Sequence, residues 1–181
     1  MMTDLINCIV AQINNKDYAG ARSAAIELTR SPSTSVTGHI LLGHIYSANG
    51  KIAEATLEYN KVLHGNPFNW VCHVSLANMY AASSRWGKHD KQQALFHASI
   101  AVKERSGDWR SYATMAAALA RSGFFSAAAV MESKAMAMAP PSRQSARALI
   151  LEKYFLEKRL RRLKLEPIDS NETFPALAEG P

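Results

Sequence analysis

The sequence predicts an all-α protein in which antiparallel helix pairs stack side by side. Three observations predict it: apolar residues recur at spacings of three and four, small residues return at fixed positions, and the pattern repeats with a period of 34 residues. Of the 181 residues, 48% are hydrophobic and 20% are charged, which provides enough apolar material for a core and excludes a disordered chain. Nine glycines and seven prolines exclude collagen-like and linker sequences.

Two copies of the repeat, 36–69 and 109–142, show the pattern best, and their equivalent residues lie 73 positions apart. The first carries Leu42, Gly43, Tyr46, Gly50, Ala55, Tyr59, Val62 and Pro67; the second carries Met115, Ala116, Leu119, Gly123, Ala128, Glu132, Ala135 and Pro140. The copy between them, 70–108, holds extra residues near 83–90, which predict a longer turn between its two helices. A weaker copy spans 2–35.

Small residues mark the places where the two helices of a pair must approach closely. They are Gly43, Ala77 and Ala116 in the first helices and Ala55, Ala94 and Ala128 in the second helices. Gly50 and Gly123 occupy the turns, where a positive φ is expected, and Pro67 and Pro140 follow helix ends because proline cannot continue a helix. One pair cannot bury its own apolar face, so the pairs are expected to stack into an array.

These residues resemble the tetratricopeptide repeat (TPR) family over 2–142, most specifically in the Leu-Gly-x-x-Tyr of the 36–69 copy. The resemblance implies a right-handed superhelical solenoid whose first helices line a concave groove, which holds a peptide or helix of a partner protein. Carried over by position, the expected groove residues are Ile6, Val10, Thr37, Ile40, His44, Val71, Val74, Asn78, Arg110, Ala113 and Ala117. Most are apolar or small, which suits a partner with apolar anchors.

One TPR subgroup grips the carboxyl end of chaperones with a clamp of Lys, Asn and Arg residues. The matching positions here are Ile40, His44, Ser75, Arg110 and Thr114, of which only Arg110 is cationic. This chain is therefore not expected to bind such tails. It is more similar to arrays that hold apolar segments, the type III secretion chaperones among them.

Residues 143–164 predict a basic capping helix with eight basic and two acidic side chains, starting at Arg143 with Ser142 as its cap. Its leucines, among them Leu149 and Leu156, share one face. The densest basic patch is Arg159, Arg161, Arg162 and Lys164. Either these residues are only solvated, or the helix contacts an acidic protein, a membrane surface or nucleic acid. Residues 165–181 hold four acids and no base and predict a flexible acidic tail, in which Phe174 to Leu177 form a short apolar motif.

Catalytic and metal-binding patterns are missing from the sequence. There is no HExxH, CxxC, GxxxxGK[ST], GxGxxG or GxSxG, and Cys8 and Cys72 are expected to be small packed residues. We therefore expect no enzyme activity, no cofactor and no metal. No apolar run is long enough for a membrane span and no secretory signal is evident, so a cytoplasmic location is expected. Trp86, in the longer turn, either covers that turn or forms a contact point.

The function that the sequence favours is a non-enzymatic interaction module, an adaptor or chaperone that holds a partner protein in its groove. Two alternatives remain open. A nucleic-acid-binding or regulatory protein would use the basic helix and bind in a salt-dependent manner. An assembly factor or subunit of a larger complex, such as a secretion system, would dock permanently by one edge of the array.

Overall fold

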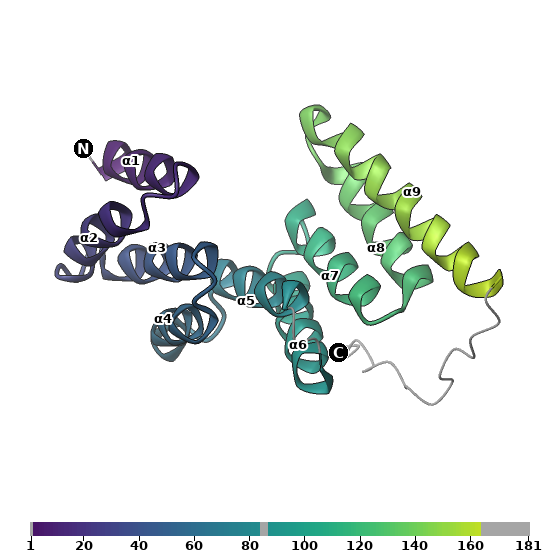
Figure 1. Cartoon of the computed structure of the whole chain (residues 1–181), viewed down its shortest axis with the longest axis horizontal. Coiled ribbons are helices and arrows are strands. Elements are labelled where there is room, and N and C mark those ends of the chain that lie inside the picture. The colour runs from purple at the N-terminus through teal and green to yellow at the C-terminus, as the bar shows by residue number, and fades with distance from the viewer. Residues whose placement is uncertain (1, 84–86, 164–181) are drawn as a thin grey trace.

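The computed structural model describes residues 2–83 and 87–163, with the side chains of the last helix described up to Glu157. The described residues form helices and no strand (Figure 1). The helices are α1 (Met2–Asn14), α2 (Tyr18–Thr29), α3 (Ser35–Ala48), α4 (Ile52–Gly65), α5 (Trp70–Ala82), α6 (Lys88–Glu104), α7 (Trp109–Arg121), α8 (Phe125–Met138) and α9 (Pro141–Leu163). The first eight form four consecutive pairs, and α9 follows the last pair.

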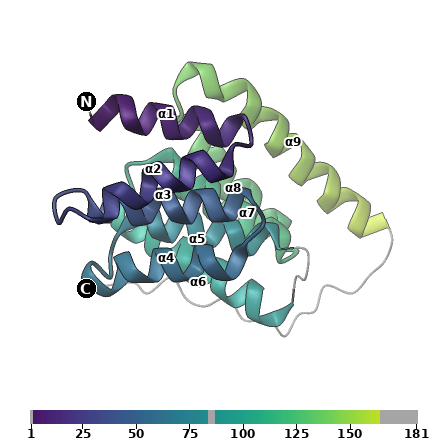
Figure 2. The same cartoon turned by 60° about the vertical axis from the view of Figure 1, so that its left-hand side comes forward.

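The helices form a solenoid in which each helix packs on the next helix along the chain. In addition, first helices pack on first helices, because α1 contacts α3, α3 contacts α5, and α5 contacts α7. Figure 1 shows the array running from α1 at one end to α8 and α9 at the other, and Figure 2 shows the same stack from another side. The predicted fold class, an all-α array of antiparallel helix pairs closed by a C-terminal helix, is confirmed.

Local chemistry explains where the helices begin and turn. The side chains of Asp17, Asn69 and Asp108 cap α2, α5 and α7 by accepting hydrogen bonds from backbone N–H groups. The turns inside the second and fourth pairs place Gly50 at φ 73° and Gly123 at φ 92°, as the sequence predicts. A side chain is strained in this left-handed region, so glycine is favoured there.

The predicted close approaches also occur. Ala55, Ala77, Ala94, Ala116 and Ala128 are completely buried. A Cβ added to Gly43 would meet the ring of Tyr59 on α4, with Cζ only 2.7 Å away. Small side chains therefore set the distance between the helices of the second, third and fourth pairs.

Gly38, which the sequence analysis did not single out, has a similar role between pairs. A Cβ at this position would meet the backbone of Leu28 and Thr29 at 2.9 and 2.7 Å. The weak first copy is thus joined to the second through a close backbone contact.

Two predicted boundaries differ from the structure. The last helix begins at Pro141 rather than Arg143, because proline fits the first helical turn, where its missing N–H leaves no bond unmade. In the longer turn, Lys88 to Asp90 already belong to α6, so the predicted loop is shorter at this end. Trp86 and the tail 165–181 lie outside the described residues.

Candidate interaction groove

A groove of about 460 Å³ lies between α5, α7 and α9, with Phe125 at the start of α8 on its border. We call it the first-helix groove. Its lining consists of Asn78, Ala81, Ala82, Ala117, Ala120, Arg121, Phe125, Lys153, Tyr154 and Glu157. It therefore combines an alanine floor with aromatic and charged groups.

Four alanines, whose side chains end at Cβ, leave room above the floor of the groove. Ala81 and Ala82 come from the last turn of α5, and Ala117 and Ala120 come from α7. Asn78 is exposed beside them and brings an amide that can both donate and accept hydrogen bonds. The Arg121 side chain crosses to α5, where its Nη2 donates to the Ser83 carbonyl at 3.0 Å. Such a surface admits the backbone or apolar side chains of another segment.

The α9 side of the groove is aromatic and charged. Tyr154 is half-buried, and burial raises the pKa of its hydroxyl to about 12, with the Glu132 carboxylate adding to the rise and Arg147 opposing it. The hydroxyl therefore remains protonated near neutral pH and can donate a hydrogen bond. Lys153 and Glu157 place opposite charges along the same side. The groove is thus amphipathic rather than uniformly basic.

An ionic contact attaches α9 to the array and so positions Tyr154. Arg147 Nη1 donates to Glu132 Oε1 of α8 at 3.0 Å, and its guanidinium lies 5.0 Å from the ring centre of Trp109. Glu132 is only 1% exposed. Burial raises the pKa of Glu132, while Arg147 opposes this rise. Loss of Arg147 would leave a buried carboxyl without its partner.

The structure places two of the eleven predicted groove residues, Asn78 and Ala117, in this groove. Six others are half-buried along the array outside it: Ile6, Thr37, Ile40, Val71, Val74 and Ala113. Val10 is 44% exposed near the N-terminal end. The binding role of all these residues stays a prediction.

The two remaining predicted residues are engaged within the protein. His44 Nε2 and Ser75 Oγ are hydrogen-bonded at 3.0 Å, and burial lowers the pKa of His44, which favours the neutral ring. The Arg110 side chain forms two hydrogen bonds with Asp108, from Nε to Oδ1 at 3.0 Å and from Nη2 to Oδ2 at 2.7 Å. Its guanidinium also lies 4.6 Å from the ring centre of Trp70. His44 and Arg110 therefore each contact a neighbouring first helix, α5 in both cases.

The sequence analysis missed the α9 residues Lys153, Tyr154 and Glu157 because it read 143–164 as a basic capping or contact helix and did not continue the groove positions into it. A signal was present, since Tyr154 lies 34 residues after Ala120 and 73 after Ala81. Continuing the repeat register would have placed Tyr154 beside those two groove residues.

The predicted basic patch is not described at the level of side chains. Arg159, Arg161 and Arg162 belong to the last turns of α9, but their side chains, and all of Lys164, lie outside the described residues. Within the described part of α9, Arg143 and Lys153 are exposed, whereas Arg147 is paired with Glu132.

The two cysteines differ in their surroundings. Cys72 is buried, as expected, and burial raises the pKa of its thiol to about 12. Cys8 is exposed, so the prediction that it is a packed residue is wrong. His73 and His97 are hydrogen-bonded to each other through their Nδ1 atoms at 2.9 Å. Within residues 2–83 and 87–163, no group of three or more His, Cys, Asp or Glu residues has the arrangement of a metal site. No helix in that same part of the chain is both long and apolar enough to traverse a bilayer.

The helix pairing and first-helix packing define a TPR-like helical-repeat fold. Among the solved structures similar to this chain is that of MamA (AMB-1, crystal form P212121). The two share 14% sequence identity and a TM-score of 0.55, over 92% of this chain and 93% of MamA. No known family profile matches this chain. No curated protein sequence matches it either. The likeness therefore concerns the fold.

Proposed function

We propose that this protein is a non-enzymatic interaction module that holds a segment of a partner protein in the first-helix groove. The groove itself is the observation that carries the proposal: three first-position helices converge on an alanine floor bordered by Phe125 and Tyr154. An aromatic pair around a floor of small side chains suits apolar anchors of a peptide or helix. Asn78, Lys153 and Glu157 would provide polar contacts to its flanks.

The TPR-like fold supports a protein partner rather than a small molecule. In such an array the helices form an extended surface, and the groove is open along α5, α7 and α9. An adaptor or chaperone role, and a cytoplasmic location, stay predictions. So do the alternatives of nucleic-acid binding through Arg159, Arg161, Arg162 and Lys164, and of permanent assembly into a larger complex.

Replacing either of two alanines by arginine tests the groove. Ala117→Arg places a long charged side chain on the floor, whereas Ala137→Arg places the same side chain on an exposed position of α8 outside the groove. Tagged wild type and both variants are used to capture partners from the native cell, and circular dichroism checks that each remains folded. The expected result is a partner recovered with wild type and Ala137→Arg and reduced at least about tenfold with Ala117→Arg. Equal recovery by both variants, or no specific partner with wild type, would overturn the proposal.

A further inference from the structure

The last helix occupies the position of a first helix in a fifth repeat. Pro67 and Pro140 are equivalent positions of the repeat, so Trp70, three residues after Pro67, corresponds to Arg143, although α9 begins two residues earlier, at Pro141. The same register makes Leu149 equivalent to Leu42, Leu76 and Met115 of α3, α5 and α7. Like those helices, α9 packs on the second helix of the preceding pair, here α8.

Equivalent positions differ sharply in burial. Leu42, Leu76 and Met115 are 5%, 1% and 6% exposed, whereas Leu149 is 68% exposed. The difference has a structural cause: each internal first helix lies between the second helix before it and the second helix of its own pair. Within the described residues, α9 has only the first of these two neighbours. Its outer face is where the missing helix would pack.

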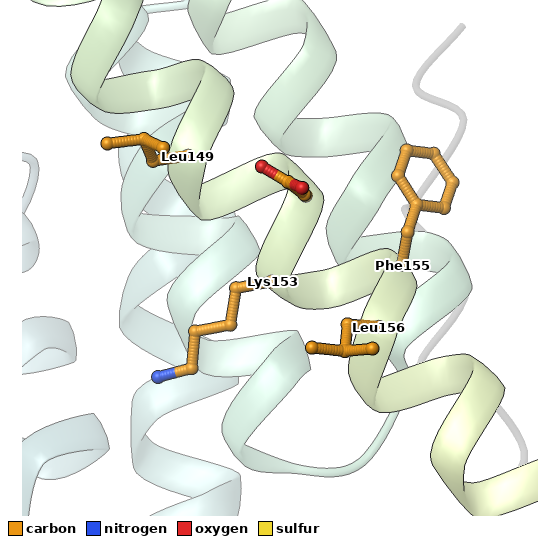
Figure 3. A pocket seen from close by; sticks show the side chains of 5 residues that line it. Leu149, Lys153, Phe155 and Leu156 are labelled. Atoms are coloured by element: carbon orange, nitrogen blue, oxygen red, sulfur yellow. The ribbon is translucent and has the colours of Figure 1, made fainter.

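That face forms a shallow hollow of about 450 Å³ lined by Leu149, Glu152, Lys153, Phe155 and Leu156 (Figure 3). Leu149 and Leu156 are one heptad apart and therefore lie on the same side of α9, opposite the half-buried Tyr154. Phe155 and Leu156 are each 54% exposed. The hollow is thus a surface separate from the first-helix groove, although Lys153 borders both.

We propose that an amphipathic, acidic helix of a partner protein docks on this face and completes the fifth helix pair in trans. The register indicates a helix, because a second helix covers the equivalent positions in the three internal pairs. The occupant needs apolar side chains one heptad apart to meet Leu149 and Leu156.

The charge of α9 determines which charged residues the partner helix should carry. Residues 143–164 carry eight basic and two acidic side chains, and Arg143 and Lys153 are exposed in the described part of α9. An acidic helix is therefore attracted to α9, and a basic helix is repelled. Opposite Glu152, the partner helix would carry one basic residue.

The sequence of residues 165–181 does not predict such a helix. Pro167 and Pro175 leave seven residues between them, whereas the internal second helix α4 has fourteen. Their four acids still make this segment the competing occupant. The test below therefore includes it.

The probe is a fluorescently labelled 18-residue peptide of Leu, Ala and Glu, with leucines one heptad apart, titrated with the full-length protein. Fluorescence anisotropy measures its affinity at low and at physiological salt. Matched peptides carry Lys in place of every Glu, or a central proline that breaks the helix. The expected result is saturable binding of the acidic peptide, with the other two at least about tenfold weaker.

Two protein variants locate the contact. Leu149→Ser/Leu156→Ser changes only exposed side chains, so the fold should persist, and the affinity should fall at least about tenfold. Ala117→Arg, in the first-helix groove, should bind the peptide like wild type. This comparison separates the present proposal from the proposed groove function, since each variant disables one surface.

Several outcomes would overturn the proposal. One is equal binding of the acidic and basic peptides, and another is full affinity in Leu149→Ser/Leu156→Ser. Binding that appears only in the full-length variant Phe174→Ser/Leu177→Ser would identify the chain's own tail as the occupant. A dimer in light scattering that dissociates in Leu149→Ser/Leu156→Ser would identify a second copy as the occupant.

Discussion

Gly43 provides a sharp test of how the helix pairs are held together. Its replacement by alanine adds one methyl group, which would meet Cζ and Cδ1 of the Tyr59 ring at 2.7 and 2.8 Å, well inside normal contact. Tyr59 is 1% exposed, and in a close-packed core a displaced ring disturbs its neighbours. Overpacking of this kind costs about 1–3 kcal/mol, and the close contacts with several ring atoms favour the upper end.

Helix propensity acts in the opposite direction. Alanine favours a helix over glycine by about 1 kcal/mol, so the expected net loss for Gly43→Ala is about 2 kcal/mol. Gly65→Ala is the matched control, because Gly65 is also helical but a Cβ there would meet no atom within 4 Å. That control should be neutral or gain up to about 1 kcal/mol.

Urea unfolding followed by circular dichroism measures both variants against wild type. Gly43→Ala should lower the unfolding midpoint, whereas Gly65→Ala should leave it unchanged or raise it. A Gly43→Ala protein as stable as Gly65→Ala would refute the conclusion that contact with Tyr59 sets the spacing of this pair.

Three further substitutions test other contacts. Arg147→Met should lower the free energy of unfolding by about 3 kcal/mol, because it leaves the buried Glu132 carboxyl unpaired. Hydrogen exchange should show α9 opening before the other helices. Unchanged protection of the α9 amides would contradict this. Burial, with the charge of the neighbouring His73 adding to it, lowers the pKa of His97 to about 4. Between pH 6.5 and 4 the unfolded chain takes up more proton at this position than the folded protein, so folding stability should fall by about 2–3 kcal/mol over this range. The measurement is the midpoint of urea unfolding at a series of pH values. Between pH 6.5 and 4 this midpoint should change less in His97→Asn than in wild type. An unchanged slope would show that His97 does not cause the loss of stability. Gly50→Ala should lose about 1 kcal/mol in thermal or urea unfolding because φ is 73° there, whereas Gly107→Ala, at an uncrowded position without positive φ, should not.

The sequence alone determined the helix pairs, because the signals for them are local and periodic. Small residues such as Ala77 and Ala116 recur where helices must approach, and Gly50 marks a turn that needs positive φ. Each of these requirements acts on a single position. A repeat of 34 residues then makes them visible several times over.

The sequence was less informative about polar residues whose partners lie in other copies. Trp70 Nε1 donates to Ser111 Oγ at 2.7 Å, and His44 is hydrogen-bonded to Ser75 of the next first helix. Neither pair is close in sequence, so their geometry depends on how the pairs stack. His44 was therefore predicted as a groove residue without its partner being known.

The last helix shows most clearly what only the tertiary structure decided. Its leucine pattern predicted an amphipathic cap, but a pattern does not say which side meets the array. Packing on α8, with Arg147 paired to Glu132, turns Tyr154 toward the groove and leaves Leu149 exposed. That orientation depends on the balance between one buried ion pair and the apolar surface on both sides of α9, which is a property of the assembled array.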